Sequence, residues 1–258
     1  MPDSLAGHLR ERLRSGPPIV GTFLKLPSLE SVDLTRSIGY DLVVVDGEHS
    51  QLDERAVLAM LRHAAAIGLP ALVRTPALEP GAINRMLEGG AAGVQLSTLR
   101  SARDRDALVA ATRYAPHGTR SVSLAHPAAD YSGIPLSRYL ELSREFPVLV
   151  GQIETARTDD GLDVLAHGLD GLFIGTTDLS VDLGKPGMFE DPAVRARVEE
   201  IARAAKSAGI ALGAWIPNVE ALAALGPVSL RYVLIGSDVQ LLRAGLTSAL
   251  AAARKAIA

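Results

Sequence analysis

Residues 39–50 read GYDLVVVDGEHS, and this stretch decides the fold class. Its centre, LVVVD at residues 42–46, is a short run of apolar and β-branched residues, as expected of a strand that is buried on both faces. LFIG at residues 172–175 and YVLIG at residues 232–236 show the same pattern. Because strands buried on both faces belong to parallel sheets covered by helices, these runs predict an α/β protein.

Short apolar runs of this kind alternate with amphipathic stretches along the whole chain. Strands are predicted at Ile19–Leu24, Leu42–Asp46, Ala71–Arg74, Gly93–Leu96, Val148–Glu154, Gly171–Gly175, Ala211–Trp215 and Tyr232–Gly236. Helices are predicted at Leu29–Ser37, Asp53–Ala66, Pro80–Glu88, Ala102–Thr112, Asp159–His167, Pro192–Ala208, Val219–Leu225 and Val239–Ile257. These strand–helix units predict a closed (β/α)8, or TIM, barrel that forms a single domain over residues 1–258. An open dinucleotide-binding sheet is disfavoured, because LKLPSLES follows the first strand instead of a G-x-G-x-x-G turn.

Composition excludes several classes of protein. The chain has 26 Lys and Arg, 29 Asp and Glu and a net charge of −3, so it lacks the basic excess of a nucleic-acid binder. It has no cysteine, which excludes disulfides, thiolate catalysis and Cys-ligated metal sites. No apolar run approaches the roughly 20 residues that span a bilayer, and the opening MPDSLAGHLRERLRSG lacks the apolar core of a signal peptide. We therefore expect a globular cytoplasmic protein with no membrane partner.

Two predicted connections are longer than the others. One runs from Tyr114 to Pro147 and contains the helical pattern LSRYLELSRE, and the other, VDLGKPGMFED, follows the sixth strand. Long connections that follow the strands of a barrel are often lids or subunit contacts. We expect such a role for both segments.

Polar and ionisable side chains follow the ends of consecutive predicted strands. The series is D-G-E-H at residues 46–49, Arg74, Gln152 with Glu154, and T-T-D at residues 176–178. The carboxyl ends of barrel strands meet at one rim, where the active sites of TIM barrels lie. This rim is therefore the predicted active site.

Glu154 and Asp178 are separated by about one strand–helix unit, so their carboxylates can converge from neighbouring strands. Two carboxylates that lie so close repel each other unless a proton or a cation lies between them. A hard divalent ion such as Mg²⁺ or Mn²⁺ suits a site with few protein ligands, whereas zinc prefers nitrogen and sulfur ligands. The alternative is structural: Asp178 would cap the turn that begins DLS, and Glu154 would pair with an arginine.

His49 and Arg74 favour the catalytic interpretation. A histidine in a polar turn at a strand end is placed for proton transfer, and the planar guanidinium of Arg74 can hold a carboxylate through two hydrogen bonds. The alternative for Arg74 is a salt bridge to Glu48 or Glu154. Asp46 is expected to orient the turn and to take no part in the chemistry. The pattern as a whole predicts that a metal and Arg74 bind a 2-oxo acid while His49 moves a proton.

The chain resembles the HpcH/HpaI family of class II pyruvate aldolases over nearly its whole length. The motifs that carry the resemblance are GYDLVVVDGEHS, LVRTP at residues 72–76, ATRYAPHGTRSV at residues 111–122, VGQIET at residues 150–155, GLDGLFIGTTDLSVDLGKPG at residues 168–187 and IGSDVQLL at residues 235–242. Each motif alone is weak, but their order and spacing are specific.

The resemblance implies the reversible cleavage of a 4-hydroxy-2-oxo acid into pyruvate and an aldehyde through a pyruvate enolate. By the same resemblance, Glu154 and Asp178 match the ligands of a divalent ion, Mg²⁺, Mn²⁺ or Co²⁺, and His49 matches the catalytic histidine. The residues that match the pyruvate site are Arg74, Gln152, Gly175, Thr176 and Thr177. The family also implies a homo-oligomer, a hexamer in which the last helix, residues 239–257, is exchanged between subunits.

Some positions depart from the family pattern. MLEGG places Glu88 where the family has the aspartate that partners the catalytic histidine, so Glu88 is the expected third catalytic residue. LSTL and RSVS bring Ser97, Thr98 and Ser121 to positions where the family pattern carries no hydroxyl group. These hydroxyls predict a more polar pocket for the aldehyde.

Three alternatives remain open. A lyase of the citrate-lyase-β-like group, which acts on acyl-CoA substrates, would use Arg100, Arg103 and Arg105 to bind nucleotide phosphates, although a solvated helix face accounts for this cluster better. The second alternative is a barrel that binds an oxo acid without turnover. In the third, Lys25 at the end of the first strand forms a Schiff base, as in class I aldolases.

Overall fold

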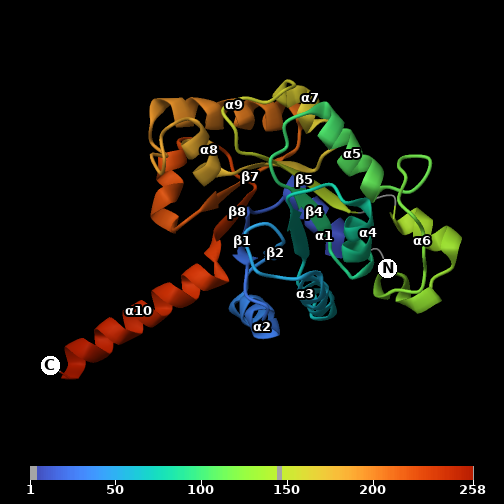
Figure 1. Cartoon of the computed structure of the whole chain (residues 1–258), viewed down its shortest axis with the longest axis horizontal. Coiled ribbons are helices and arrows are strands. Elements are labelled where there is room, and N and C mark those ends of the chain that lie inside the picture. Colours follow the sequence, from blue (N-terminus) through green and yellow to red (C-terminus); the bar gives the residue numbers. More distant parts are fainter. Residues whose placement is uncertain (1–4, 144–146, 258) are drawn as a thin grey trace.

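The computed structural model describes residues 5–143 and 147–257, and residues 1–4, 144–146 and 258 lie outside that part. Eight parallel strands form a closed barrel in which each strand pairs with the next and β8 pairs with β1 (Figure 1). The strands are β1 (Ile19–Leu24), β2 (Leu42–Asp46), β3 (Ala71–Thr75), β4 (Gly93–Leu96), β5 (Val148–Ile153), β6 (Gly171–Ile174), β7 (Ala211–Ile216) and β8 (Tyr232–Ser237). The predicted (β/α)8 barrel is confirmed.

Helices surround the barrel. They are α2 (Leu29–Ile38), α3 (Glu54–Ala66), α4 (Pro80–Glu88), α5 (Ala102–Thr112), α7 (Leu162–Ala166), α8 (Thr176–Asp182), α9 (Pro192–Ala208) and the 3₁₀ segment η3 (Val219–Leu225). The last helix, α10 (Asp238–Ile257), follows β8. The helix α7 begins at Leu162 rather than at Asp159, because the preceding residues are bound to the start of α5. The N–H of Asp159 donates to the carbonyl of Arg100, and the Asp160 carboxylate accepts the N–H of Ala102.

The helices begin and end where the sequence carries capping residues. Ser28, Asp53 and Ser101 each accept, through the side chain, a backbone N–H from three residues further on. The helix α2 ends at Gly39, whose φ of 100° lies in the left-handed region that favours glycine. These local signals explain why most of the predicted helix boundaries agree with the structure.

The core has two layers, because successive side chains of a strand point to opposite faces. In β2, Leu42 and Val44 belong to the cluster inside the barrel, whereas Val43 and Val45 pack against the surrounding helices. A helix that was not predicted, α1 (Leu5–Arg14), adds its buried face to the inner cluster. The alternation of β2 continues to its last residue, so the side chain after Val44 on the inner face is that of Asp46.

The long connection between α5 and β5 lies, in its described residues 113–143 and 147, at the amino end of the barrel. It follows α5 and leads into β5, and it contains η1 (Pro127–Ser132) and α6 (Leu136–Leu142). Figure 1 shows α6 on the side of the molecule opposite α10. Because α5 returns from the carboxyl end of the barrel to the amino end, this segment is not placed to form a lid over the strand ends. The other expected role, a subunit contact, stays a prediction. Residues 144 and 145 of the predicted helical pattern lie outside the described part.

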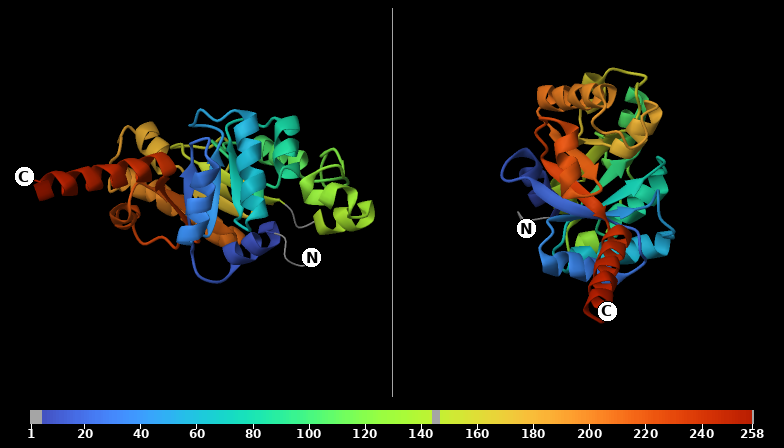
Figure 2. Two further views of the ribbon diagram at one scale, coloured as in Figure 1. Left: turned by 90° about the horizontal axis from the view of Figure 1, so that it is seen from below. Right: turned by 90° about the vertical axis from the view of Figure 1, so that its left-hand side faces the viewer.

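The last helix, α10, extends away from the barrel (Figures 1 and 2). None of its residues is buried, and the apolar side chains of Leu242, Leu246 and Leu250 are 53%, 63% and 53% exposed. A contiguous exposed apolar surface marks a contact site for another molecule. Among residues 5–143 and 147–257, no helix is both long and apolar enough to cross a membrane.

Candidate active site

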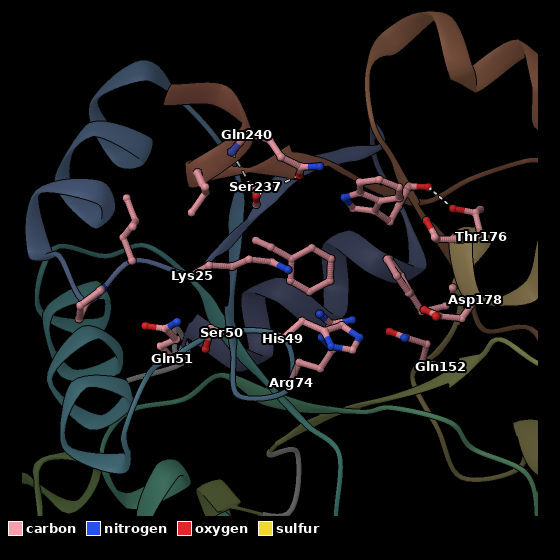
Figure 3. Close-up of a pocket in the computed structure, with 18 residues that line it drawn as sticks. Lys25, His49, Ser50, Gln51, Arg74, Gln152, Thr176, Asp178, Ser237 and Gln240 are labelled. Carbon is pink, nitrogen blue, oxygen red and sulfur yellow. Dashed lines mark hydrogen bonds between the residues drawn. The ribbon is translucent and has the colours of Figure 1, made fainter. Parts of the chain in front are cut away.

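The carboxyl end of the barrel holds a cavity of about 660 Å³. Of the predicted site residues, His49, Arg74, Gln152, Gly175, Thr176, Thr177 and Asp178 line it. Trp215, Ser237 and Gln240 also line the cavity and were not predicted as site residues. Figure 3 shows Gln152, Thr176 and Asp178 on one side of the cavity and Lys25, Ser50 and Gln51 on the other, with His49 and Arg74 between them. The cavity therefore extends well beyond the residues expected to bind pyruvate.

Arg74 and Asp46 form a buried ion pair at the ends of two neighbouring strands. They lie opposite each other in the register of β2 and β3, and both point into the barrel. The Nε and Nη2 groups of Arg74 donate to the two oxygens of Asp46 at 2.9 and 2.6 Å. The Arg74 guanidinium also lies 4.3 Å from the ring centroid of Phe23. The Asp46 partner was not predicted, and Glu48, at 3.3 Å from Nη1, is a second contact.

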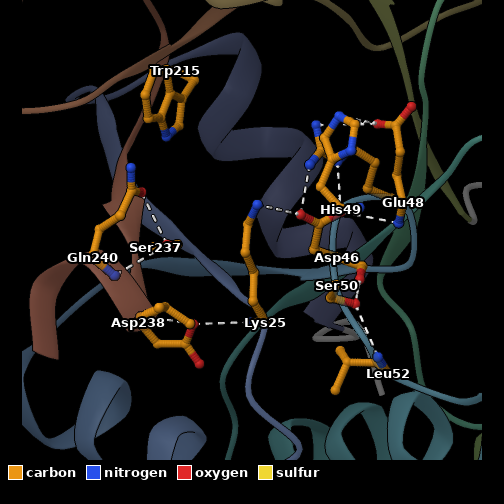
Figure 4. A network of polar contacts seen from close by, with 12 residues as sticks. Lys25, Asp46, Glu48, His49, Ser50, Leu52, Trp215, Ser237, Asp238 and Gln240 are labelled. Atoms are coloured by element: carbon orange, nitrogen blue, oxygen red, sulfur yellow. Dashed lines mark hydrogen bonds and ion pairs between the residues drawn. The ribbon is translucent and has the colours of Figure 1, made fainter. Parts of the chain in front are cut away.

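Asp46 has further partners, which keep it ionised. Its Oδ1 accepts the backbone N–H groups of Glu48 and His49 at 3.1 and 3.2 Å, which confirms that Asp46 orients the turn. The Lys25 ammonium lies 3.1 Å from Oδ2 (Figure 4). Burial alone would raise the pKa of Asp46, but the hydrogen bonds and charge of Arg74, the His49 N–H and the charge of Lys25 lower it to about 2. Arg74 is therefore held by a permanent charge, which leaves its Nη1 directed toward Glu48.

His49 lies at the mouth of the cavity with Glu48 as its acidic neighbour. The His49 side chain is 55% exposed, and its Nε2 lies 3.7 Å from Glu48 Oε2. That same Glu48 oxygen accepts a hydrogen bond from Ser97 Oγ at 2.6 Å. Glu48 was not predicted as the acidic neighbour of His49. It could have been, because Glu48 and His49 are adjacent in the DGEH motif and therefore lie at the same rim of the barrel. The structure thus places an exposed histidine beside a carboxylate that the Ser97 hydroxyl holds in place.

Within one chain, Glu88 contacts Asn84 and His126 and not His49, so its predicted catalytic role stays a prediction. Its Oε1 accepts a hydrogen bond from Asn84 at 3.2 Å and lies 4.0 Å from His126 Nε2. The helix α4 runs back to the amino end of the barrel, where the N–H of Ala92 donates to the carbonyl of Ala71 at the start of β3. The end of α4 therefore lies at the opposite end of the barrel from His49.

Glu154 is a buried carboxylate, 6% exposed, that follows β5 directly. One of its oxygens accepts a hydrogen bond from Thr98 and the other from Gln152. These contacts do not include an arginine, which was the structural alternative for Glu154. Burial raises the pKa of Glu154, and the charges of Glu48 and Asp178 add to this, against the lowering effect of the two hydrogen bonds. The carboxylates of Glu48, Glu154 and Asp178 therefore lie close enough for their charges to interact.

Asp178 approaches the same region from β6. It lies in the first turn of α8, and the helix has no side-chain cap, so the alternative role of Asp178 as a capping residue is not observed. Gly175 at the start of this turn is required sterically, because a Cβ there would lie 2.6 Å from both Cβ and Oε2 of Glu154. The Thr176 hydroxyl does not bind either carboxylate, since it donates to the carbonyl of Trp215 at 2.9 Å.

The carboxylates Glu154 and Asp178 fit a divalent ion. A cation would relieve the mutual repulsion that, together with burial, raises the pKa of Glu154. No group of three or more His, Cys, Asp and Glu side chains arranged to hold a metal is found within the described ranges. A site with only two protein carboxylates suits Mg²⁺ or Mn²⁺, which keep several waters that a substrate can replace.

Comparison with known proteins agrees with this geometry. Residues 20–244 match the model of the HpcH/HpaI aldolase/citrate lyase family. The chain is 36% identical to a 4-hydroxy-2-oxovalerate aldolase of Rhodococcus jostii, covering 94% of each protein. It is 34% identical to a 4-hydroxy-2-oxo-heptane-1,7-dioate aldolase of Salmonella typhimurium, covering 92% of this chain and 90% of that protein.

The fold agrees as well. A solved HpcH/HpaI aldolase/citrate lyase family protein of Burkholderia cenocepacia superposes with a TM-score of 0.87 at 31% identity, covering 96% of this chain and 99% of that one. The family match spans all eight strands except the first residue of β1. The chain belongs to the HpcH/HpaI aldolase/citrate lyase family.

Proposed function

We propose that the chain is a divalent-metal-dependent carbon–carbon lyase that reversibly cleaves a 4-hydroxy-2-oxo acid into pyruvate and an aldehyde. The observation that carries this proposal is that His49, Arg74 and Asp178 line one cavity at the carboxyl end of a barrel of this family, while the charge of Asp178 acts on the buried Glu154. The relatives named above are aldolases of 4-hydroxy-2-oxo acids, which supports the reaction class.

In the proposed reaction, Arg74 binds the oxo-acid end of the substrate. Two of its nitrogens are occupied by Asp46, and Nη1 is the donor that remains on the side of Glu48 and the cavity. Gln152 and the backbone of residues 175–177 line the same side and complete the binding surface for the carboxylate and keto groups. Fixed donors of this kind stabilise an enolate, because the negative charge develops on oxygen.

Glu154 and Asp178 would hold the divalent ion, Mg²⁺ or Mn²⁺, with Co²⁺ as a further candidate. When bound, such an ion acts as a Lewis acid that stabilises negative charge on oxygen. Metal dependence is typical of the family. Burial is the main cause of the raised pKa of Glu154, and the charges of Glu48 and Asp178 add to it. A bound cation would favour the ionised form of Glu154 against these effects, which supports this assignment.

His49 moves the protons. In cleavage, it accepts the proton of the 4-hydroxyl group at Nε2, the C3–C4 bond breaks, and its electron pair becomes the enolate of pyruvate while C4 leaves as the aldehyde. Protonation of C3 then gives pyruvate. The exposed imidazole can release and regain a proton at the mouth of the cavity, next to Glu48. Glu88 is given no step, because it lies against Asn84 and His126.

Exchange of the pyruvate methyl protons for deuterium tests the proposal without knowledge of the aldehyde. We expect exchange in the presence of Mg²⁺ or Mn²⁺, loss of exchange with a chelator, and loss of exchange in Glu154→Gln. The matched control is Glu141→Gln, an exposed glutamate that pairs with Arg138, and it should exchange like the wild type. An absence of exchange with every metal, or full exchange in Glu154→Gln, would contradict the proposal.

The remaining alternatives have specific tests. Lys25 is paired with Asp46 at 3.1 Å, which opposes Schiff-base chemistry, and borohydride trapping with pyruvate should give no adduct on it. Arg100 pairs with Asp159 at 3.3 Å and Arg105 donates to two backbone carbonyls, so this cluster offers little to a nucleotide. We therefore expect no cleavage of malyl-CoA. Mn²⁺-dependent pyruvate binding without release of an aldehyde from any hydroxy-oxo acid would favour a binding protein.

We also propose a homo-oligomer in which α10 packs on a neighbouring subunit. The exposed leucines of α10 support this arrangement, and so do Leu34 and Ile38 of α2, which are 60% and 72% exposed. Removal of residues 239–257 should reduce the mass measured by light scattering from that of a hexamer. An unchanged mass would contradict the exchange of this helix.

A further inference from the structure

The turn that follows β4 carries two adjacent hydroxyl groups that bind two different acids of the site. Ser97 Oγ donates to Glu48 Oε2 at 2.6 Å, and Thr98 Oγ1 donates to Glu154 Oε1. Glu48 comes from the turn after β2, and Glu154 follows β5. One short segment therefore contacts acidic groups on both sides of the oxo-acid site.

Thr98 adopts an unusual backbone conformation in this turn. Its φ is 47°, in the left-handed region that β-branched residues rarely occupy. The neighbours hold the backbone there: the N–H of Ser97 donates to the carbonyl of Thr75 at 3.0 Å, and the N–H of Leu99 donates to the carbonyl of Gln152 at 2.8 Å. A strained residue that is held from both sides and whose hydroxyl faces a site carboxylate indicates a functional constraint.

The geometry points to Thr98 as a positioning residue that fixes Glu154 for divalent-metal binding, and to Ser97 as the residue that fixes Glu48 beside Arg74 and His49. This inference rests on the proposed function in one respect, the assignment of Glu154 as a metal ligand. It concerns how this chain holds its ligand rather than which groups are the ligands.

Glu154 is held from two directions. Gln152 Nε2 donates to Oε2, and Gln152 is itself fixed inside the barrel, where its Oε1 accepts from Gln95 Nε2 at 2.7 Å. Gln95 Oε1 in turn faces the hydroxyl of Tyr232 at 3.4 Å. Thr98 supplies the second donor, to Oε1. Each carboxylate oxygen has two lone pairs, so one donor on each oxygen orients the group and leaves the remaining lone pairs for a cation.

The two hydroxyls should affect different properties. Hydrogen bonds that orient a metal-ligating carboxylate usually contribute about 10–100-fold to metal affinity, which is the effect expected from Thr98. Ser97 acts on Glu48, whose Oε2 lies 3.3 Å from Arg74 Nη1 and 3.7 Å from His49 Nε2. Loss of the Ser97 hydroxyl should therefore affect the proton-transfer step more than metal binding.

Mn²⁺ binding to the full-length protein, measured by electron paramagnetic resonance without substrate, tests the role of Thr98. Thr98→Val keeps the β-branched shape and removes the donor, and we expect a Kd at least about tenfold higher. Thr98→Ser keeps the donor and should restore affinity to within about threefold. The control is Thr158→Val, because the Thr158 hydroxyl donates only to the carbonyl of Asp160 in an exposed loop. A Thr98→Val protein that binds like the wild type, or a Thr98→Ser protein as weak as Thr98→Val, would overturn the proposal.

Two further variants separate positioning from a merely structural role. Thr98→Gly suits a positive φ, so its melting temperature should not fall although its Mn²⁺ affinity does. Ser97→Ala, at saturating Mn²⁺, should slow deuterium exchange into pyruvate several-fold, with a smaller change in Mn²⁺ affinity than in Thr98→Val. If the Mn²⁺ affinity of Thr98→Gly falls only together with its melting temperature, the positioning role of Thr98 is wrong. If Ser97→Ala exchanges deuterium into pyruvate as fast as the wild type, the role of Ser97 is wrong.

The outcomes also distinguish this inference from the proposed function. Suppose that the wild type binds Mn²⁺ through Glu154 and Thr98→Val binds it more weakly, but no pyruvate protons exchange. This result would support the role of Thr98 and contradict the proposed reaction. A wild-type protein that exchanges and cleaves, with Thr98→Val binding Mn²⁺ normally, would preserve the reaction and contradict the inference.

Discussion

The two ends of the barrel each contain a buried arginine–aspartate pair with nearly the same geometry. At the carboxyl end, Arg74 donates to the two oxygens of Asp46 at 2.9 and 2.6 Å. At the amino end, Arg10 donates to the two oxygens of Asp170 at 2.6 and 2.9 Å. The residue types and the fork-like pairing are alike, although Asp46 is fully buried and Asp170 is slightly exposed. The main difference between the pairs lies in what surrounds them.

The surroundings separate a structural pair from a functional one. Arg10 of α1 also donates to the carbonyl of Pro147, and Asp170 accepts the N–H of Leu149, so this pair joins α1 to the starts of β5 and β6. Arg74 instead keeps Nη1 for Glu48 and the cavity. The same kind of ion pair thus joins α1 to the barrel at the amino end and directs an N–H donor into the cavity at the carboxyl end. Residue types alone do not distinguish the two, but position relative to the strand ends does.

The largest expected effect is at the carboxyl end. Asp178→Asn should abolish metal-dependent turnover, because one of only two proposed carboxylate ligands loses its charge. Glu154→Gln should do the same without a lower melting temperature in the absence of metal, since burial and neighbouring charges already disfavour the ionised Glu154. Pyruvate release and thermal unfolding measure the two quantities. Retained turnover in both variants would show that Asp178 and Glu154 have no role in the reaction, like Asp170 at the amino end.

His49→Ala should lower turnover about 10²–10⁴-fold, the usual contribution of general acid–base catalysis. The melting temperature should stay near that of the wild type, because the His49 side chain is 55% exposed. His8→Ala, an exposed histidine of α1 at the amino end, serves as the control and should leave turnover unchanged. If both variants keep full cleavage and exchange, the proton path assigned to His49 is wrong.

The amino-end pair should show the opposite behaviour. Arg10→Met removes the side chain that donates to both oxygens of Asp170 and leaves the N–H of Leu149 and the charge of Arg113 near that carboxylate. Breaking a largely buried pair costs about 3–5 kcal/mol of the free energy of unfolding, and the remaining contacts place the expected cost at about 3 kcal/mol. In a chain of this size, we expect the melting temperature to fall by roughly 10 °C, while kcat at 25 °C stays within about twofold. Thermal unfolding and a pyruvate assay on the same sample test both statements. A large loss of kcat in fully folded Arg10→Met would remove the distinction between the two ends.

The barrel could be predicted from the sequence because its strands are continuous β-branched runs that are buried on both faces. LVVVD at residues 42–46 is a strand with the predicted limits. The helix α8 was not predicted, because its sequence TTDLSVD is short and no side chain caps its N-terminus. The helix α1 escaped prediction since it precedes the first strand and belongs to no repeating unit.

The site was predictable to the level of single strands and not to the level of contacts. Period-two alternation along β3 and β5 puts Arg74 and Gln152 inside the barrel, so their position in the cavity follows from the sequence. Glu88 was assigned by its place in a motif, although the return direction of α4 carries it to the amino end. The bonds of Ser97 and Thr98 to two acids depend on the left-handed backbone at Thr98, which no local pattern indicates.

The smallest expected effect concerns the acid stability of the carboxyl-end pair. The pKa of Asp46 is lowered from 3.8 to about 2, so this group stabilises the folded protein fully above about pH 4 and loses that contribution as the pH falls through 2. The contribution is about 2 kcal/mol. Urea unfolding between pH 5 and pH 2 should therefore show a decline in the free energy of unfolding that is about 2 kcal/mol smaller in Asp46→Asn than in the wild type. Equal declines would mean that Arg74 does not bind Asp46 in solution, so that Asp46 would not orient the guanidinium that is proposed to bind the substrate.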